Sequence, residues 1–171
     1  MDHTDVGLKS AIRALNDVVA PVVGKEHAQA RDQLRLTTDY LAFVIERLPH
    51  LHQRDRFELS HHLAMARDVH AALPASSAPE LAAEMEAAQQ MLERAGPSTA
   101  EVRQATADLS AAVSAVVRGS ASLVAAEQRD VERAVLHASE QRIAFERAWY
   151  LPLGLDPDPH DVQPLAAFLP A

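Results

Sequence analysis

Ten prolines and five glycines divide this chain of 171 residues into long alanine-rich stretches. Because proline ends a helix and glycine weakens one, these positions mark where helices stop. Between them, apolar residues recur every three or four positions, which is the period of a helix with one buried face. We therefore expect an all-α fold, namely an antiparallel bundle of five or six helices.

The helical stretches can be placed between these breaks. We expect helices over about 5–20, 26–48, 55–73 and 79–94, with Pro21 ending or kinking the first. The stretch 99–149 is either one long helix or two antiparallel ones. A single helix would be about 75 Å long at 1.5 Å per residue, so we expect a break at Gly119.

Three of the expected helix starts carry the signature of an N-terminal cap. In a capping box, a Ser, Thr or Asp side chain binds the backbone N–H three residues on, and a Glu there binds back. The pairs with this spacing are Asp55/Glu58, Ser77/Glu80 and Ser98/Glu101. We expect each pair to open a helix.

The end of the chain differs from the rest. Residues 151–171 contain five prolines, so a regular helix cannot run through them. Their apolar residues are too frequent for a disordered tail. We expect a helical bundle over 1–150 and an extended C-terminal arm over 151–171, packed on the bundle or on a partner subunit. A frayed terminus is the alternative.

Charge and composition exclude several classes of protein. The net charge is −8 with only two lysines, so we expect no nucleic-acid partner, which would need a basic patch. The absence of cysteine excludes disulfides, thiolate nucleophiles and cysteine zinc sites. The polar N-terminus does not resemble a signal peptide, and no apolar run approaches the roughly 20 residues of a membrane span. We expect a cytoplasmic protein with no membrane partner.

Polar residues within apolar stripes are the candidate ligand-binding groups. His70 lies in the apolar stripe of the third helix, and His62 lies at its edge. Arg142 lies within the apolar face of the last helix, and Tyr40 could flank a pocket. Buried groups of this kind need partners. His70 is either a satisfied core histidine or a ligand contact, and Arg142 either forms an internal ion pair, for example with Glu146, or binds an anionic ligand.

One short motif has metal-binding spacing. Glu58 and His61 match the Glu-x-x-His pattern of carboxylate-bridged di-metal bundles, which need a second copy of the motif. The second copy is missing, and His61 falls opposite the apolar stripe, so we expect it to face solvent. We therefore expect no metal site and no cofactor.

The second helix is apolar on two opposite sides, which is typical of a central helix or of one with a second contact. Its main stripe runs from Leu34 to Leu48, and Leu36 and Phe43 lie on the other side. Further apolar residues follow at the end of the last helix and in the arm. The expected interface consists of Leu36, Phe43, Trp149, Leu153, Leu155 and Phe168.

No catalytic motif is present: the chain has neither a glycine-rich phosphate loop nor a Gly-x-Ser-x-Gly turn. The leading hypothesis is a non-enzymatic helical interaction or accessory protein that forms homodimers or binds a protein partner. The alternative is a small-molecule or metal-binding bundle, possibly catalytic, with a His/Arg site in its core.

A further hypothesis comes from the pattern of residues 8–48. It contains Leu8, Ala11 and Leu15 at helical spacing, Pro21 after a valine-rich helix end, Ala30-Arg31, and the segment 41–48. This pattern resembles a family of uncharacterised small all-helical bacterial proteins encoded near acyl-CoA dehydrogenases and aminoglycoside-phosphotransferase-like kinases. The resemblance implies a helper or partner role in a catabolic gene neighbourhood, and it carries over no site residue.

Overall fold

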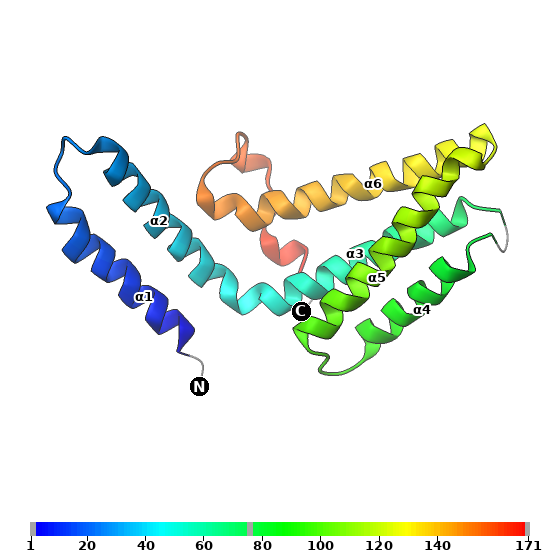
Figure 1. The fold of residues 1–171 in the computed structure, drawn as a ribbon, viewed down its shortest axis with the longest axis horizontal. Coiled ribbons are helices and arrows are strands. Elements are labelled where there is room, and N and C mark those ends of the chain that lie inside the picture. Colours follow the sequence, from blue (N-terminus) through cyan, green and yellow to red (C-terminus); the bar gives the residue numbers. More distant parts are fainter. Residues whose placement is uncertain (1–2, 75–76, 170–171) are drawn as a thin grey trace. The chain divides into compact units, whose positions relative to one another are not determined.

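The computed structural model describes residues 3–74 and 77–169, and in that part of the chain it contains six α-helices and no strand (Figure 1). The expected all-α fold is therefore confirmed. The helices are α1 (Thr4–Ala14), α2 (Ala28–Arg47), α3 (Leu51–Ala71), α4 (Pro79–Glu93), α5 (Thr99–Gly119) and α6 (Ala125–Tyr150). None of the helices in the described residues is long and apolar enough to cross a membrane.

The chain forms two compact units. Unit 1 comprises the described residues of Met1–Leu51 and of Tyr150–His160, and unit 2 comprises those of His52–Trp149 and of Asp161–Ala171. The C-terminal segment thus contributes residues to both units. The expected division into a bundle of 1–150 and an arm of 151–171 stays a prediction.

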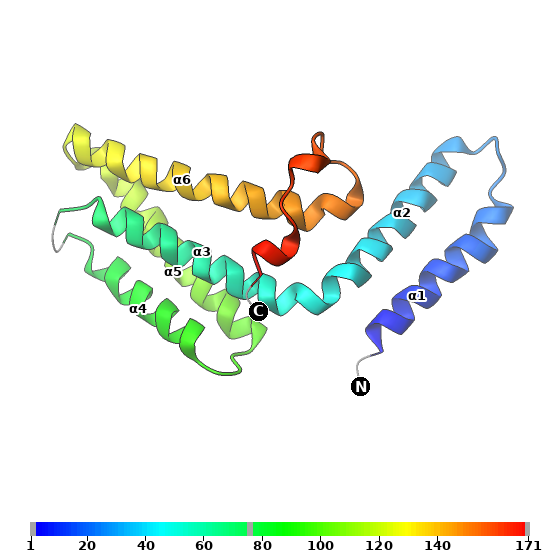
Figure 2. The ribbon, with the colours of Figure 1, turned by 180° about the vertical axis from the view of Figure 1, so that it is seen from behind.

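Unit 1 is built on an antiparallel hairpin of α1 and α2 (Figures 1 and 2). The chain continues beyond α1 as a π-helical turn, Leu15–Val19, and a 3-10 turn, Ala20–Val22. Pro21 accounts for this change, because its ring cannot donate the backbone hydrogen bond of a regular helix. We call residues 4–47, from the start of α1 to the end of α2, the hairpin.

Unit 2 contains α3, α4, α5 and most of α6 around an aliphatic core. Leucine and valine fill this core, and alanines between them let neighbouring helices approach closely. The buried members are Leu59, Leu63, Ala66, Val69, Leu81, Ala88, Val102, Leu109, Val113 and Val131. The break expected at Gly119 is confirmed, since α5 ends there and a 3-10 turn, Ser120–Ser122, precedes α6.

The three expected capping boxes have different outcomes. The box at Ser98 is formed: the Ser98 hydroxyl accepts from the Glu101 N–H, and the Glu101 carboxylate accepts from the Ser98 N–H at 2.8 Å. The box at Ser77 is wrong, because Ala78 is the N-cap of α4 and the Ser77 hydroxyl instead donates to the Pro74 carbonyl.

The expected N-cap at Asp55 is also wrong. Only a 3-10 turn, Leu48–His50, separates α2 from α3, so α3 begins earlier than expected. Asp55 therefore lies inside α3, where it is buried and accepts a hydrogen bond from Arg103 Nε at 2.9 Å. The partner explains the buried carboxylate, because a buried charge needs a counter-charge.

Candidate functional site

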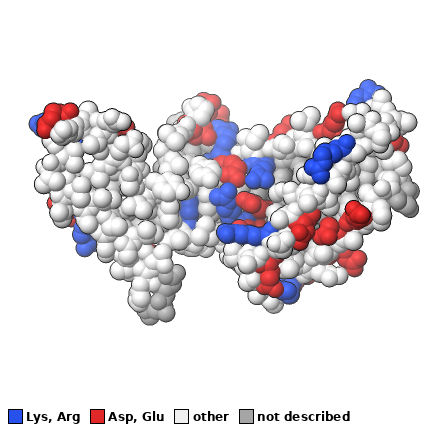
Figure 3. Space-filling view, viewed as in Figure 1, with Lys and Arg blue, Asp and Glu red and all other residues white. Residues whose placement is uncertain are grey.

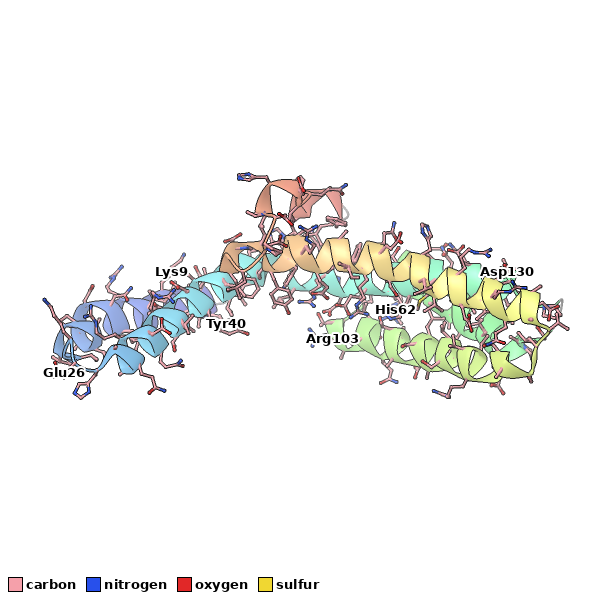
Figure 4. The ribbon with its side chains drawn as sticks, turned by 90° about the horizontal axis from the view of Figure 1, so that it is seen from above. Lys9, Glu26, Tyr40, His62, Arg103 and Asp130 are labelled. Carbon is pink, nitrogen blue, oxygen red and sulfur yellow. The ribbon has the colours of Figure 1, made fainter. Side chains whose placement is uncertain are left out.

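The four candidate ligand-binding residues belong to different units. Tyr40 comes from α2 in unit 1, whereas His62 comes from α3 in unit 2 (Figure 4). His70 is also on α3, and Arg142 is on α6, both in unit 2. Three of the four, His62, His70 and Arg142, therefore share one unit.

The two predicted histidines of α3 differ in burial. His62 is buried, and its Nδ1 lies 2.8 Å from the Glu58 carbonyl one turn earlier, to which the ring N–H donates. This bond supplies the hydrogen-bond partner that a buried imidazole requires. His70 is only half buried, so it does not lie in the core of unit 2.

His61 is buried, so the expectation that it faces solvent is wrong. Its exposed fraction is 7%, and its ring lies 6.0 Å from that of Phe57 and edge-on to that of His62. Its Nδ1 has no hydrogen-bond partner. Burial lowers the pKa of His61, and nearby His62 and Arg142 lower this pKa further, while a hydrogen bond with Gln141 opposes the shift.

Arg142 is exposed, although it lies on the side of α6 that carries the buried residues Ala138 and Phe145. Its side chain is long enough for the guanidinium to reach water from the edge of the helix. A different arginine lies between α3 and α6. The Arg54 guanidinium lies 4.6 Å from the centroid of the Trp149 ring and pairs with Glu58 at 3.2 Å and Glu146 at 3.1 Å. The i,i+4 spacing of Arg54 and Glu58 was the only sequence signal for this cluster.

Two of the predicted interface residues pack inside unit 2. Trp149 is buried, and its ring lies 6.0 Å from that of Phe145. Phe168 is half buried and contacts the stacked pair of Phe57 and Phe145 edge-on, at 6.1 and 5.8 Å. These contacts attach the end of the described chain to unit 2.

Among the described residues, no group of three or more histidine, aspartate and glutamate side chains is placed to hold a metal ion. The polar residues between α3 and α6 instead form ion pairs and ring contacts with one another. Within unit 2 they stabilise the packing of α3 against α6.

The hairpin of unit 1 has an apolar face with few contacts. Not one described residue of α1, of the π-helical turn or of the 3-10 turn is buried. Val18 and Val22 are exposed in those turns. In α2 only Thr38, Phe43 and Arg47 are buried.

The second apolar stripe of α2, expected from the sequence, is only partly covered. Leu36 and Tyr40 lie one turn apart on it, with exposed fractions of 44% and 56%. Phe43 is next along the stripe and is only 6% exposed, because the Tyr150 ring stacks on it at 5.6 Å. The Arg47 guanidinium also lies over the Phe43 ring, 5.7 Å from its centroid. We call Leu36, Tyr40, Phe43 and Tyr150 the α2 patch.

Residues after α6 lie beside this patch. A 3-10 turn, Leu151–Leu153, packs on α2. Leu153 is half buried there, and Leu155 is 79% exposed. Of the six predicted interface residues, Leu36, Phe43, Leu153 and Leu155 therefore belong to unit 1.

The net charge of the segment that carries most of the α2 patch is close to zero. Residues 1–51 carry six Lys/Arg and seven Asp/Glu, a net charge of −1, whereas residues 52–171 carry −7. Next to the patch, Arg35 pairs with Asp32 at 2.9 Å and with Asp39 at 3.1 Å within α2. On the face shown in Figure 3, charged side chains are frequent over unit 2 and sparse over the hairpin.

Comparison with known proteins identifies no relative, since no family model, no curated protein and no solved structure matches the chain. The family resemblance of residues 8–48 therefore stays a prediction.

Proposed function

We propose that this protein is a non-enzymatic helical interaction protein that associates with a second copy of itself through the hairpin of unit 1. The observation that carries the proposal is the hairpin's lack of a core. Its first helix and the two turns that follow contain apolar residues, and none of those described is buried.

A hairpin with so little buried surface needs a further packing partner. The helical run over residues 4–22 buries none of its residues, and most helical stability in proteins comes from the tertiary packing of an apolar face. Removing apolar side chains from water is the main favourable term in folding and association. Covering Leu36, Tyr40, Val18 and Val22 would therefore stabilise the hairpin.

A second copy is the partner that the charges favour. Two strongly acidic surfaces repel each other, and most of the net negative charge lies outside residues 1–51. The nearly neutral hairpin is therefore the surface at which two copies can meet at the lowest electrostatic cost. A pair with twofold symmetry buries the same surface of both copies, so each copy covers the apolar residues of the other.

A second candidate function is a ligand site in unit 2, favoured by the unpartnered Nδ1 of buried His61. A buried imidazole nitrogen without a partner is costly, and a small polar ligand could satisfy it. Native mass spectrometry of the protein purified from its host distinguishes the candidates. A bound organic or metal mass supports a ligand site, and a dimer without added mass supports self-association.

The proposal is tested by sedimentation of the full chain from 1 to about 200 μM, a range that covers affinities typical of weak dimers. We expect a monomer–dimer equilibrium, and Leu36→Glu should weaken it roughly tenfold or more, because association would bury the new carboxylate. Ala42→Glu is the matched control, since Ala42 is exposed on another side of α2. A wild-type chain that is monomeric throughout this range contradicts the proposal.

A further inference from the structure

We propose that the C-terminal segment of unit 1, Tyr150–His160, confines the contact between the α2 helices of two copies to the stretch 36–40. The two α2 helices then cross antiparallel, with Leu36 of each copy against Tyr40 of the other. This inference rests on the proposed function, because it specifies how the two copies meet. The inference follows from the second apolar stripe of α2. One part of this stripe is covered within the chain, one part is polar, and one part is both apolar and exposed.

The C-terminal part of the stripe is already occupied within one chain. Phe43 is buried under the Tyr150 ring, and the Arg47 side chain is also buried. The turn Leu151–Leu153 packs on the same helix. A second copy cannot contact this half of α2 without displacing the C-terminal segment.

The N-terminal part of the stripe is polar. Counting back from Leu36 in steps of three and four, the residues on the same side of α2 are Gln33, Asp32 and Gln29, and all three are exposed. Burying two amides and a carboxylate at a second helix without partners for them would be unfavourable. The free apolar part of the stripe is therefore a single turn, bounded by Gln33 on one side and Phe43 on the other.

The position of this turn selects the orientation of the second helix. α2 spans Ala28–Arg47, and Leu36 and Tyr40 lie on either side of its midpoint near Thr38. Antiparallel helices related by a twofold axis at the midpoint place Leu36 of one copy against Tyr40 of the other. The polar N-terminal half of each α2 helix then lies over the C-terminal segment of the other copy, and the two polar halves do not lie side by side.

A parallel pair of α2 helices would be less favourable for two reasons. It would bring the two covered Phe43 regions and their C-terminal segments to the same end of the contact, where they would collide. It would also align the dipoles of the two α2 helices side by side, whereas antiparallel helices place opposite ends together. Because the free stretch is only one turn long, the helices should cross steeply, near the common angle of about −50°.

The arrangement can be tested by disulfide cross-linking, because the wild-type chain contains no cysteine. Leu36→Cys is mixed with a size-tagged Tyr40→Cys chain and oxidised at a concentration at which wild type is dimeric. A disulfide needs Cα atoms within about 7 Å, so we expect the mixed 36–40 product to form several-fold faster than either product with two identical positions. Ala42→Cys, off the stripe, is the control and should remain uncross-linked.

The role of the C-terminal segment is tested in the same assay. Phe43→Cys should cross-link poorly in the full chain, and adding Tyr150→Ala should raise its rate several-fold by uncovering the position. Arg47→Cys, at the buried position one turn further along α2, replaces Phe43→Cys if circular dichroism shows that the latter has lost helix.

The outcomes separate the two proposals. If wild type is a dimer but the 36–36 and 40–40 products dominate, or no product forms, the antiparallel crossing is overturned while self-association stands. If position 43 or 47 cross-links as fast as position 36 with Tyr150 present, confinement by the C-terminal segment is overturned. If wild type is a monomer, the proposed function itself fails.

Discussion

At the residue scale, the positions of His61 and Arg142 are the clearest departures from expectation. The period of a helix tells which residues share a side, and it placed His61 opposite the apolar stripe of α3. Unit 2 packs against α3 on more than one side, so His61 faces Gln141 and Phe57 rather than water. Arg142 shares a side with buried residues of α6, yet its length lets its charge stay in water.

The buried imidazole of His61 predicts that stability depends on pH. Burial lowers the pKa of His61 in the folded state below its ordinary value of 6.5, so the unfolded chain binds the proton first as pH falls. This contribution to stability is complete above about pH 6.5 and decreases as pH falls toward the lowered pKa. Urea unfolding at pH 7.5 and pH 5 should show a smaller loss of stability for His61→Phe than for wild type.

The control for this pH effect is a histidine that stays in water. His160 is exposed, so His160→Gln should lose as much stability as wild type between the two pH values. An equal loss for wild type and His61→Phe would show that the imidazole is not buried in solution.

At the element scale, a capping pair defines the start of a helix only where the chain before it is not already helical. Ser98 follows Gly96 and Pro97, which separate α5 from α4, and the capping box forms as its spacing predicts. Its hydrogen bonds with Ser98, and a further bond from Arg94, lower the pKa of Glu101 to about 2. Asp55 has a similar spacing but lies within a chain that is already helical, so its side chain binds Arg103 instead.

The contrast between two serines gives a prediction about helix capping. Ser98→Ala should lower the free energy of unfolding by about 1 kcal/mol, because the N–H of Glu101 loses its side-chain acceptor. Ser77→Ala should cost less than about 0.5 kcal/mol, since Ser77 does not cap α4. Chemical denaturation of both variants measures the difference, and equal losses would contradict it.

At the scale of the whole molecule, the two units differ in how they are stabilised. Unit 2 has a continuous core of fully buried leucine and valine, whereas the described part of unit 1 buries only Thr38, Phe43 and Arg47 along α2 and nothing along α1. Stability need not be uniform across such a chain, and regions with few buried contacts open first.

This difference predicts that the stability of the hairpin depends on protein concentration. If a second copy covers it, backbone amides of α1 should exchange with deuterium more slowly at concentrations above the dimer dissociation constant than below it. Amides around Leu109 in α5 should exchange at the same slow rate in both conditions, because their core lies within one chain. Hydrogen exchange with mass spectrometry measures both regions in one sample, and an α1 rate independent of concentration would contradict the prediction.

The all-helical fold, the break at Gly119, the capping box at Ser98 and the two apolar sides of α2 follow from local sequence, because each depends on residues close together in the chain. Three features depend instead on packing between distant segments: His61 is buried, Arg54 rather than Arg142 lies against Trp149, and Tyr150 covers Phe43. Local periodicity assigns each residue to a side of its helix, but the number of sides that become covered depends on contacts between residues far apart in the sequence.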